Sequence, residues 1–201
     1  LPQAFAKAGY QTGCFSANGL IDGPGFRQGF DHFWSAGGLT HYTQCFFSGK
    51  ILSAEQFFLS MKTAEKFRLH KIRGNTVCDL AKGWLKTRQK ERPAFAYIHL
   101  LEPHWPYHDY GHGLVNKKTK NISKPISHID LLQLTNGVSK NARIKETPEF
   151  QEFQGRYDEG IKEADDIIGR FYNHLKELEI ADSTMIVFVG DHGEELLEHN
   201  G

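Results

Sequence analysis

The chain has 201 residues, and its 24 Lys and Arg are balanced by 24 Asp and Glu, so the formal net charge is zero. This balance argues against a general nucleic-acid-binding protein, which normally carries a basic excess, and against an acidic disordered tail. Hydrophobic residues make up 39% and charged residues 24%, as in an ordinary globular domain. No stretch reaches the roughly 18 apolar residues that a membrane span needs, and no signal peptide is recognisable at the start.

The first 40 residues are predicted to hold one short helix and one strand. Residues 1–9 place apolar side chains on one face and finish on a glycine, which predicts the end of an amphipathic helix. Residues 12–17 favour a short strand, and Asn18 with the following glycine favours a turn. Residues 22–40 are rich in glycine and aromatic side chains, so we expect a surface excursion with little regular structure.

The middle of the chain is predicted to form two helices and a buried strand. Residues 53–71 carry apolar side chains at helical spacing behind Ser53, which is a good N-cap residue. Residues 75–90 repeat this pattern behind Asn75. Residues 93–101 are nearly all apolar, which is typical of a strand that is buried on both faces.

The rest of the chain combines an insertion, a long helix and a strand. Residues 108–148 are polar and rich in lysine, and we interpret them as an insertion. From 148 to 179 apolar side chains recur every three or four residues, which predicts a long amphipathic helix. A turn at 181–183 leads into the apolar residues 185–189, which favour a strand.

The order of these elements predicts the fold class. Short apolar strands that alternate with amphipathic helices are typical of an α/β fold, in which helices cover both faces of a mostly parallel sheet. The sequence contains no clear domain boundary and no internal repeat.

Each predicted strand is followed by polar side chains that can bind a metal or transfer a proton. Because ligands of open parallel sheets bind beyond the carboxyl ends of the strands, we expect these side chains to share one rim. They are Asn18 after the first strand, Glu102 and His104 after the second, and Asp191, His192 and Glu194 after the third.

Two readings of the dipeptide Asp191–His192 stay open at this point. Gly190 and Gly193 flank it and permit tight turns, so a carboxylate and an imidazole can reach the same metal ion. The alternative is that Asp191 caps a helix beginning near Gly193, with His192 a surface residue.

His104 lies between Pro103 and Pro106, which are expected to hold the segment extended and to aim the imidazole. The alternative is a loop histidine that packs against Trp105 or Tyr107.

The long helix also carries Asp158 and Asp165, which lie seven residues apart and roughly on one face. Paired carboxylates can serve catalysis, but a solvated or sheet-edge polar face is the better account, and capping of neighbouring helices is a third option.

Four segments, taken together and in order, form a specific pattern. They are residues 1–12, 95–107 (FAYIHLLEPHWPY), 157–169 (YDEGIKEADDIIG) and 183–194 (STMIVFVGDHGE). This pattern resembles the sulfatase family of the alkaline phosphatase superfamily. The resemblance covers the chain apart from residues 40–90 and 108–148.

The resemblance implies an alkaline-phosphatase-like fold and a hydrolase that cleaves sulfate esters. Asp191 and His192 would be ligands of a divalent cation, with calcium the first expectation and manganese or another ion the alternative, because imidazole is a softer ligand than oxygen. His104 matches the family's histidine that contacts the sulfate and protonates the leaving oxygen. Asn18 lies where many members have Lys-x-His, and we assign it a polar contact to the substrate.

Several parts of the family's site are absent from the sequence. There is no Cys/Ser-x-Pro-x-Arg nucleophile motif, and the cysteines lack its context. The first acidic metal ligands and an active-site lysine are also missing. We therefore expect residues 1–201 to be part of one sulfatase-like catalytic domain, truncated at both ends and inactive alone, with any formylglycine nucleophile outside them.

Two other functions remain open on the sequence. One is a phosphonate or phosphodiester hydrolase, or a phosphoethanolamine-type transferase, of the same superfamily. The other is a non-catalytic sulfatase-like binding domain. The partner expected for the favoured function is a small-molecule or glycan sulfate ester.

Overall fold

The computed structural model describes residues 1–18, 21, 25–36, 74–104, 107–115 and 146–196. The chain divides into two compact units, Leu1–Leu101 and Glu102–Gly201, and each is described by itself. The predicted helix at 53–71 lies outside the described residues.

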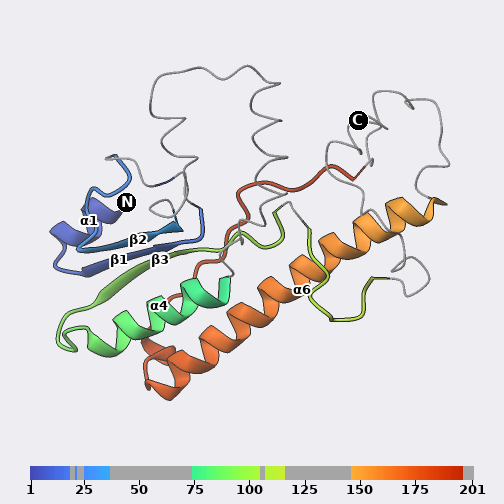
Figure 1. Cartoon of the computed structure of the whole chain (residues 1–201). Helices are drawn as coiled ribbons and strands as arrows, with labels where there is room; N and C mark the ends of the chain where they lie inside the picture. Colours follow the sequence, from blue (N-terminus) through green and yellow to red (C-terminus); the bar gives the residue numbers. More distant parts are fainter. Residues whose placement is uncertain (19–20, 22–24, 37–73, 105–106, 116–145, 197–201) are drawn as a thin grey trace. The chain divides into compact units, whose positions relative to one another are not determined.

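The first unit is built on a three-stranded parallel sheet in the order β2-β1-β3. Strand β1 (Gln11–Ser16) is central and buried along its whole length, whereas β2 (His32–Ser35) and β3 (Ala94–His99) flank it. The chain therefore has the predicted α/β class with a parallel sheet, and Figure 1 shows the three strands side by side.

Two helices cover opposite faces of this sheet. The Phe5 ring of α1 (Pro2–Lys7) stacks on Phe95 of β3 at a centroid distance of 4.3 Å. Trp84 of α4 (Gly74–Thr87) lies 5.7 Å from Phe15 of β1. Thr12 pairs with Phe95, and Phe15 lies three residues further along β1, so the two aromatic contacts fall on different faces. The central strand is thus covered on both sides (Figure 1).

The second unit is organised around α6 (Pro148–Glu177), a helix of 30 residues. Thr147 caps its start by accepting a hydrogen bond from the Phe150 backbone N–H at 3.2 Å, and Pro148 occupies a first-turn position that needs no donor. A short 3-10 helix, η4 (Ala181–Ser183), follows it where a turn was predicted. Of the helices that the structure describes, none is long and apolar enough to cross a membrane.

Strand β2 was not predicted from the sequence, which favoured an irregular excursion there. The pairing is anchored by reciprocal bonds: the Thr12 backbone N–H donates to the Asp31 carboxylate at 3.1 Å, and the Asp31 N–H donates to the Thr12 carbonyl at 3.0 Å. The backbone groups of Thr12 that make these bonds belong to β1, which is distant in the sequence. The four residues of β2 therefore carry little sequence pattern of their own that predicts a strand.

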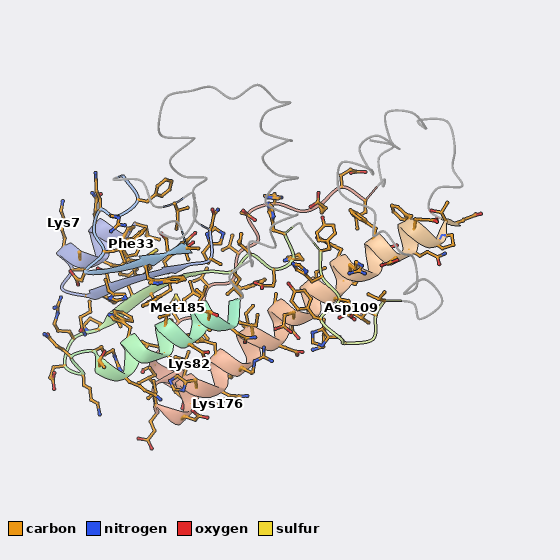
Figure 2. All side chains as sticks on the ribbon, viewed as in Figure 1. Lys7, Phe33, Lys82, Asp109, Lys176 and Met185 are labelled. Carbon is orange, nitrogen blue, oxygen red and sulfur yellow. The ribbon has the colours of Figure 1, made fainter. Side chains whose placement is uncertain are left out.

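Two other strand predictions need correction. Strand β3 is not buried on both faces: Tyr97 is 43% exposed, so the described elements leave this part of the strand uncovered. Residues 185–189 form no strand, and Met185 (labelled in Figure 2) is 88% exposed. A strand needs a hydrogen-bonding neighbour, and the described part of this unit contains no other strand.

Candidate active site

His104 lies in the second unit, directly after a turn formed by Glu102 and Pro103, and its side chain is exposed. The chain bends at His104, where an extended conformation was predicted, and Trp105 and Pro106 lie outside the described residues. The bend leaves the imidazole exposed to solvent. A group that protonates a substrate has to be accessible in this way.

A close approach to α6 supports the segment just before His104. A Cβ atom added at Gly160 would lie 2.9 Å from Cβ and 3.0 Å from Cα of Pro103. Real Cβ atoms essentially never come this close, so only glycine fits here without a shift of the backbone.

Asp191 and His192 lie on an exposed segment, with 81% and 66% of their side chains accessible. The His192 backbone N–H donates to Oδ1 of Asp191 at 3.0 Å. Residues 193–196 are not helical, so the alternative in which Asp191 caps a following helix is wrong.

The two side chains form a donor pair that suits a divalent cation. Nε2 of His192 lies 3.8 Å from Oδ2 of Asp191, about the separation of two atoms that each bind one ion at about 2.0–2.4 Å. Nδ1 of His192 lies 2.8 Å from the Gly193 carbonyl, so Nε2 is the ring nitrogen that faces Asp191. The carbonyl bond and the Asp191 charge raise the pKa of His192, so this position favours positive charge.

The described residues bring no third donor to this pair. Across the described ranges, from residue 1 to residue 196 with their gaps, no three His, Cys, Asp or Glu side chains gather in a way that could hold a metal ion.

The segments of His104 and Asp191 are tied together by one side-chain bond within the second unit. The Tyr107 hydroxyl donates to Oε2 of Glu194 at 2.6 Å. Burial and the bond to Glu194 raise the pKa of Tyr107 above its ordinary range, so the phenol stays a proton donor. The sequence pointed to Glu194 but not to Tyr107 as its partner.

An apolar cluster on the first part of α6 holds the segments of both Tyr107 and Glu194. The Tyr107 ring packs edge-on against Phe153 at 4.9 Å and against Tyr157 at 5.5 Å. Leu196, two residues after Glu194, is buried with Phe150 and Phe153. The two segments predicted to meet therefore share one platform, which is built by α6.

Asn18 lies in the first unit, where its backbone N–H donates to Oγ of Ser16 at 3.0 Å and its carbonyl accepts from the same hydroxyl at 3.2 Å. The turn after β1 is thus held locally, and the described geometry places Asn18 only within that unit.

Of the two aspartates that the sequence pointed to on the long helix, Asp165 belongs to a solvated face: it is 79% exposed and lies 3.8 Å from Lys162. Asp158 is exposed as well, although desolvation by its surroundings raises its pKa. The carboxylates that α6 buries are Glu152, Glu159 and Glu163, which the sequence analysis missed. The sequence does contain a signal for them, namely a glutamate at a position of the amphipathic helix that faces the protein interior.

None of the three cysteines was predicted to be the nucleophile, and two of them lie among the described residues. Cys14 and Cys78 are both buried, and burial raises the pKa of the Cys14 thiol to about 12. Such a thiol is almost never ionised near neutral pH. Cys45 lies outside the described residues.

The three-stranded parallel sheet with its two helices defines the first unit as part of an α/β fold. The family model described as Sulfatase matches residues 1–201, and the chain belongs to this family. The multifunctional alkaline phosphatase superfamily protein PehA of Trinickia caryophylli is 32% identical over 75 residues. The matched stretch covers 37% of this chain and 15% of that protein's length.

Proposed function

We propose that the full-length protein is a metal-dependent hydrolase of sulfate esters, and that this chain supplies part of its single catalytic domain. Family membership supports the reaction class. The observation that carries the site is the 2.6 Å bond between Tyr107 and Glu194, since it links the segment of His104 to that of Asp191 and His192. In this proposal residues 108–148 are an insertion.

His104 is the proposed general acid. Its exposed imidazole follows a backbone turn that Gly160 supports, so it can approach a substrate while its main chain stays fixed. It donates a proton to the ester oxygen as the bond to sulfur breaks, which prevents an unstable alkoxide from leaving. Asn18 is proposed to give a polar contact to the substrate.

Asp191 and His192 are proposed to hold the divalent cation, through Oδ2 and Nε2. When bound, such an ion stabilises negative charge that develops on the ester oxygens. The imidazole donor leaves manganese as well as calcium compatible with this pair. The Gly193 carbonyl orients the ring by accepting from Nδ1. The nucleophile, formylglycine or serine, is proposed to come from another part of the full-length protein.

A second candidate is hydrolysis of phosphonate esters or phosphodiesters, or phosphoethanolamine transfer. The name of the related PehA, a multifunctional alkaline phosphatase superfamily protein, supports keeping this chemistry in view. A bound cation and an imidazole acid can act on a charged ester whether its central atom is sulfur or phosphorus.

The test is turnover by the full-length protein with 4-nitrophenyl sulfate, 4-nitrophenyl phosphate and a phenylphosphonate monoester. Each substrate is measured as purified, after removal of metal with EDTA, and after readdition of Ca²⁺ or Mn²⁺. Preference for the sulfate ester, lost with EDTA and restored by metal, is the expected result. Preference for a phosphorus ester moves the assignment to the second candidate, and no turnover with any ester indicates a binding domain.

A further inference from the structure

The buried Glu159 of α6 fastens a loop to the helix with both of its carboxylate oxygens. Oε2 accepts the backbone N–H groups of Tyr110 and His112, both at 2.9 Å, and Oε1 accepts that of Leu114 at 2.7 Å. Glu159 itself is fully buried. Its carboxylate thus satisfies three main-chain donors of the segment made of residues 103, 104 and 107–115, which we call the His104 arm (Figure 2 shows the arm near Asp109 beside α6).

The arm has a backbone that suits this contact. Gly111 and Gly113 have φ angles of +88° and +85°, a region that residues with a Cβ rarely adopt. They alternate with the three donor residues, so successive donor N–H groups turn toward the same carboxylate. Such a run of inward N–H groups is an anion-binding arrangement of the main chain, here filled by the protein's own glutamate.

The charge of Glu159 fits this role. Burial by itself opposes ionisation, but the N–H donors of His112, Leu114 and Tyr110 outweigh it, and the pKa of Glu159 lies below its ordinary value. The side chain is therefore a carboxylate near neutral pH and accepts all three bonds at once.

The side chain of His112 attaches the arm one turn further along α6. Its Nε2 lies 3.1 Å from Oε2 of Glu163, and its Nδ1 lies 3.6 Å from Oδ2 of Asp166. At Gly155, an added Cβ would lie 3.0 Å from the Leu114 carbonyl oxygen, so the arm also lies directly on the helix there.

The arm is thus fixed to α6 on both sides of its exposed histidine. Pro103 lies on Gly160 before His104, and the ring of Tyr107 packs on Phe153 after it. Glu159 holds the continuation of the arm and is adjacent in sequence to Gly160. A side chain that must meet a substrate at one distance gains from a main chain that is fixed in advance.

We propose that Glu159 is a positioning residue for His104: by holding the backbone of residues 110–114 on α6, it sets the place from which the imidazole reaches the substrate. This inference rests on the function proposed above for His104. Glu159 touches neither substrate nor metal in this role, and it acts through the main chain of the arm.

The test is a double-mutant cycle in the full-length protein with Glu159→Gln and His104→Asn. A glutamine keeps one acceptor oxygen and replaces the other with an amide nitrogen that cannot accept. We expect Glu159→Gln to lower kcat for a primary alkyl sulfate by about tenfold, with KM changed less, as for other supports of active-site groups. In the His104→Asn background the same change is expected to have little further effect.

Glu177→Gln is the matched control, since it makes the same change on the same helix at a side chain that is 72% exposed. Equal, independent losses from Glu159→Gln in both backgrounds would show a general structural role and overturn the proposal. So would a Glu159→Gln protein as active as Glu177→Gln. If His104→Asn alone has full activity, the function proposed for His104 fails first, which is a distinguishable result.

Should Glu159→Gln fail to fold, Gly160→Ala takes its place in the cycle. The added methyl would press against Pro103, and the substitution does not alter the Glu159 side chain itself. A loss of kcat that depends on His104 supports positioning by the docked arm, whereas a loss independent of His104 contradicts it.

Discussion

Tyr107 and Glu194 lie 87 residues apart in the chain, and their side chains meet in a hydrogen bond of 2.6 Å. The tyrosine follows His104 by three residues, and the glutamate follows His192 by two. Aromatic packing on α6 holds the tyrosine, so the bond places the glutamate segment on the same support. This relationship links the proposed acid to the proposed metal ligands.

Replacing Tyr107 with phenylalanine tests this link. The change keeps the ring that packs on Phe153 and removes the hydroxyl that donates to Glu194. We expect metal affinity and kcat of the full-length protein to fall by about tenfold, as when outer partners of ligand segments are removed. Titration with Ca²⁺ or Mn²⁺ and steady-state kinetics measure the effect. Tyr172→Phe, at a 39% exposed tyrosine of α6, is the control, and equal behaviour of the two variants would contradict the link.

Replacing Asp191 with alanine tests the metal site. We expect loss of bound metal, measured by mass spectrometry of the purified full-length protein, together with loss of EDTA-sensitive turnover. The reason is that removing a carboxylate takes away a charged ligand and not merely a support. Asp182→Ala removes an exposed carboxylate of η4 and is expected to retain both properties. Unchanged metal content in Asp191→Ala would remove this residue from the ligand set.

Replacing His104 with alanine tests the general acid by means of the leaving group. A primary alkyl sulfate needs protonation as it leaves, so we expect kcat to fall by about 10²–10⁴-fold. 4-Nitrophenyl sulfate has a stable leaving group, and its kcat is expected to fall much less. His108→Ala changes an exposed histidine of the same segment and serves as the control. Equal losses with both substrates would mean that His104 does not donate the proton.

Two glycines of α6 differ in what surrounds them, and we expect their substitution by alanine to have opposite effects on stability. Gly160→Ala forces a methyl against Pro103, and we expect it to destabilise the protein by about 1–3 kcal/mol. Gly169→Ala meets nothing within 4 Å, and we expect it to stabilise by about 0.5–1 kcal/mol through helix propensity. Urea unfolding of the full-length variants measures both values. Two changes of the same sign would disagree with the docking of Pro103 on this helix.

The lowered pKa of Glu159 predicts an acid-dependent contribution to stability. In the unfolded chain the group takes up its proton near its ordinary value of about 4.5, and the folded protein does so only at lower pH. Its stabilisation is therefore complete above that value and is lost as pH falls through the folded pKa. The difference in free energy of unfolding between wild type and Glu159→Gln should shrink from pH 7 toward pH 3. Asp166, whose pKa is lowered mainly by its hydrogen bond to Lys162, is present in both proteins and cancels. A constant difference would contradict the assignment.

The sequence by itself determined the parts of this protein that depend on local pattern. Apolar spacing predicted α6 within two residues of its end, and a run of apolar residues predicted β3. The order of motifs indicated the sulfatase family, and the polar residues after the strands indicated His104, Asp191 and His192 as candidates, whose roles stay predictions. These signals are local because a helix face or a buried strand leaves its period in the sequence.

Tertiary structure decided what depends on partners far along the chain. The pairing of Thr12 with Asp31 makes β2 a strand, and the absence of a neighbouring strand among the described residues of their unit leaves 185–189 without one. In the sequence Glu159 is one of several acidic residues on a predicted helix. The structure distinguishes it, because three backbone N–H groups donate to its carboxylate. A hydrogen bond or a close glycine contact has no period in the sequence, because it is set by two surfaces that only folding brings together.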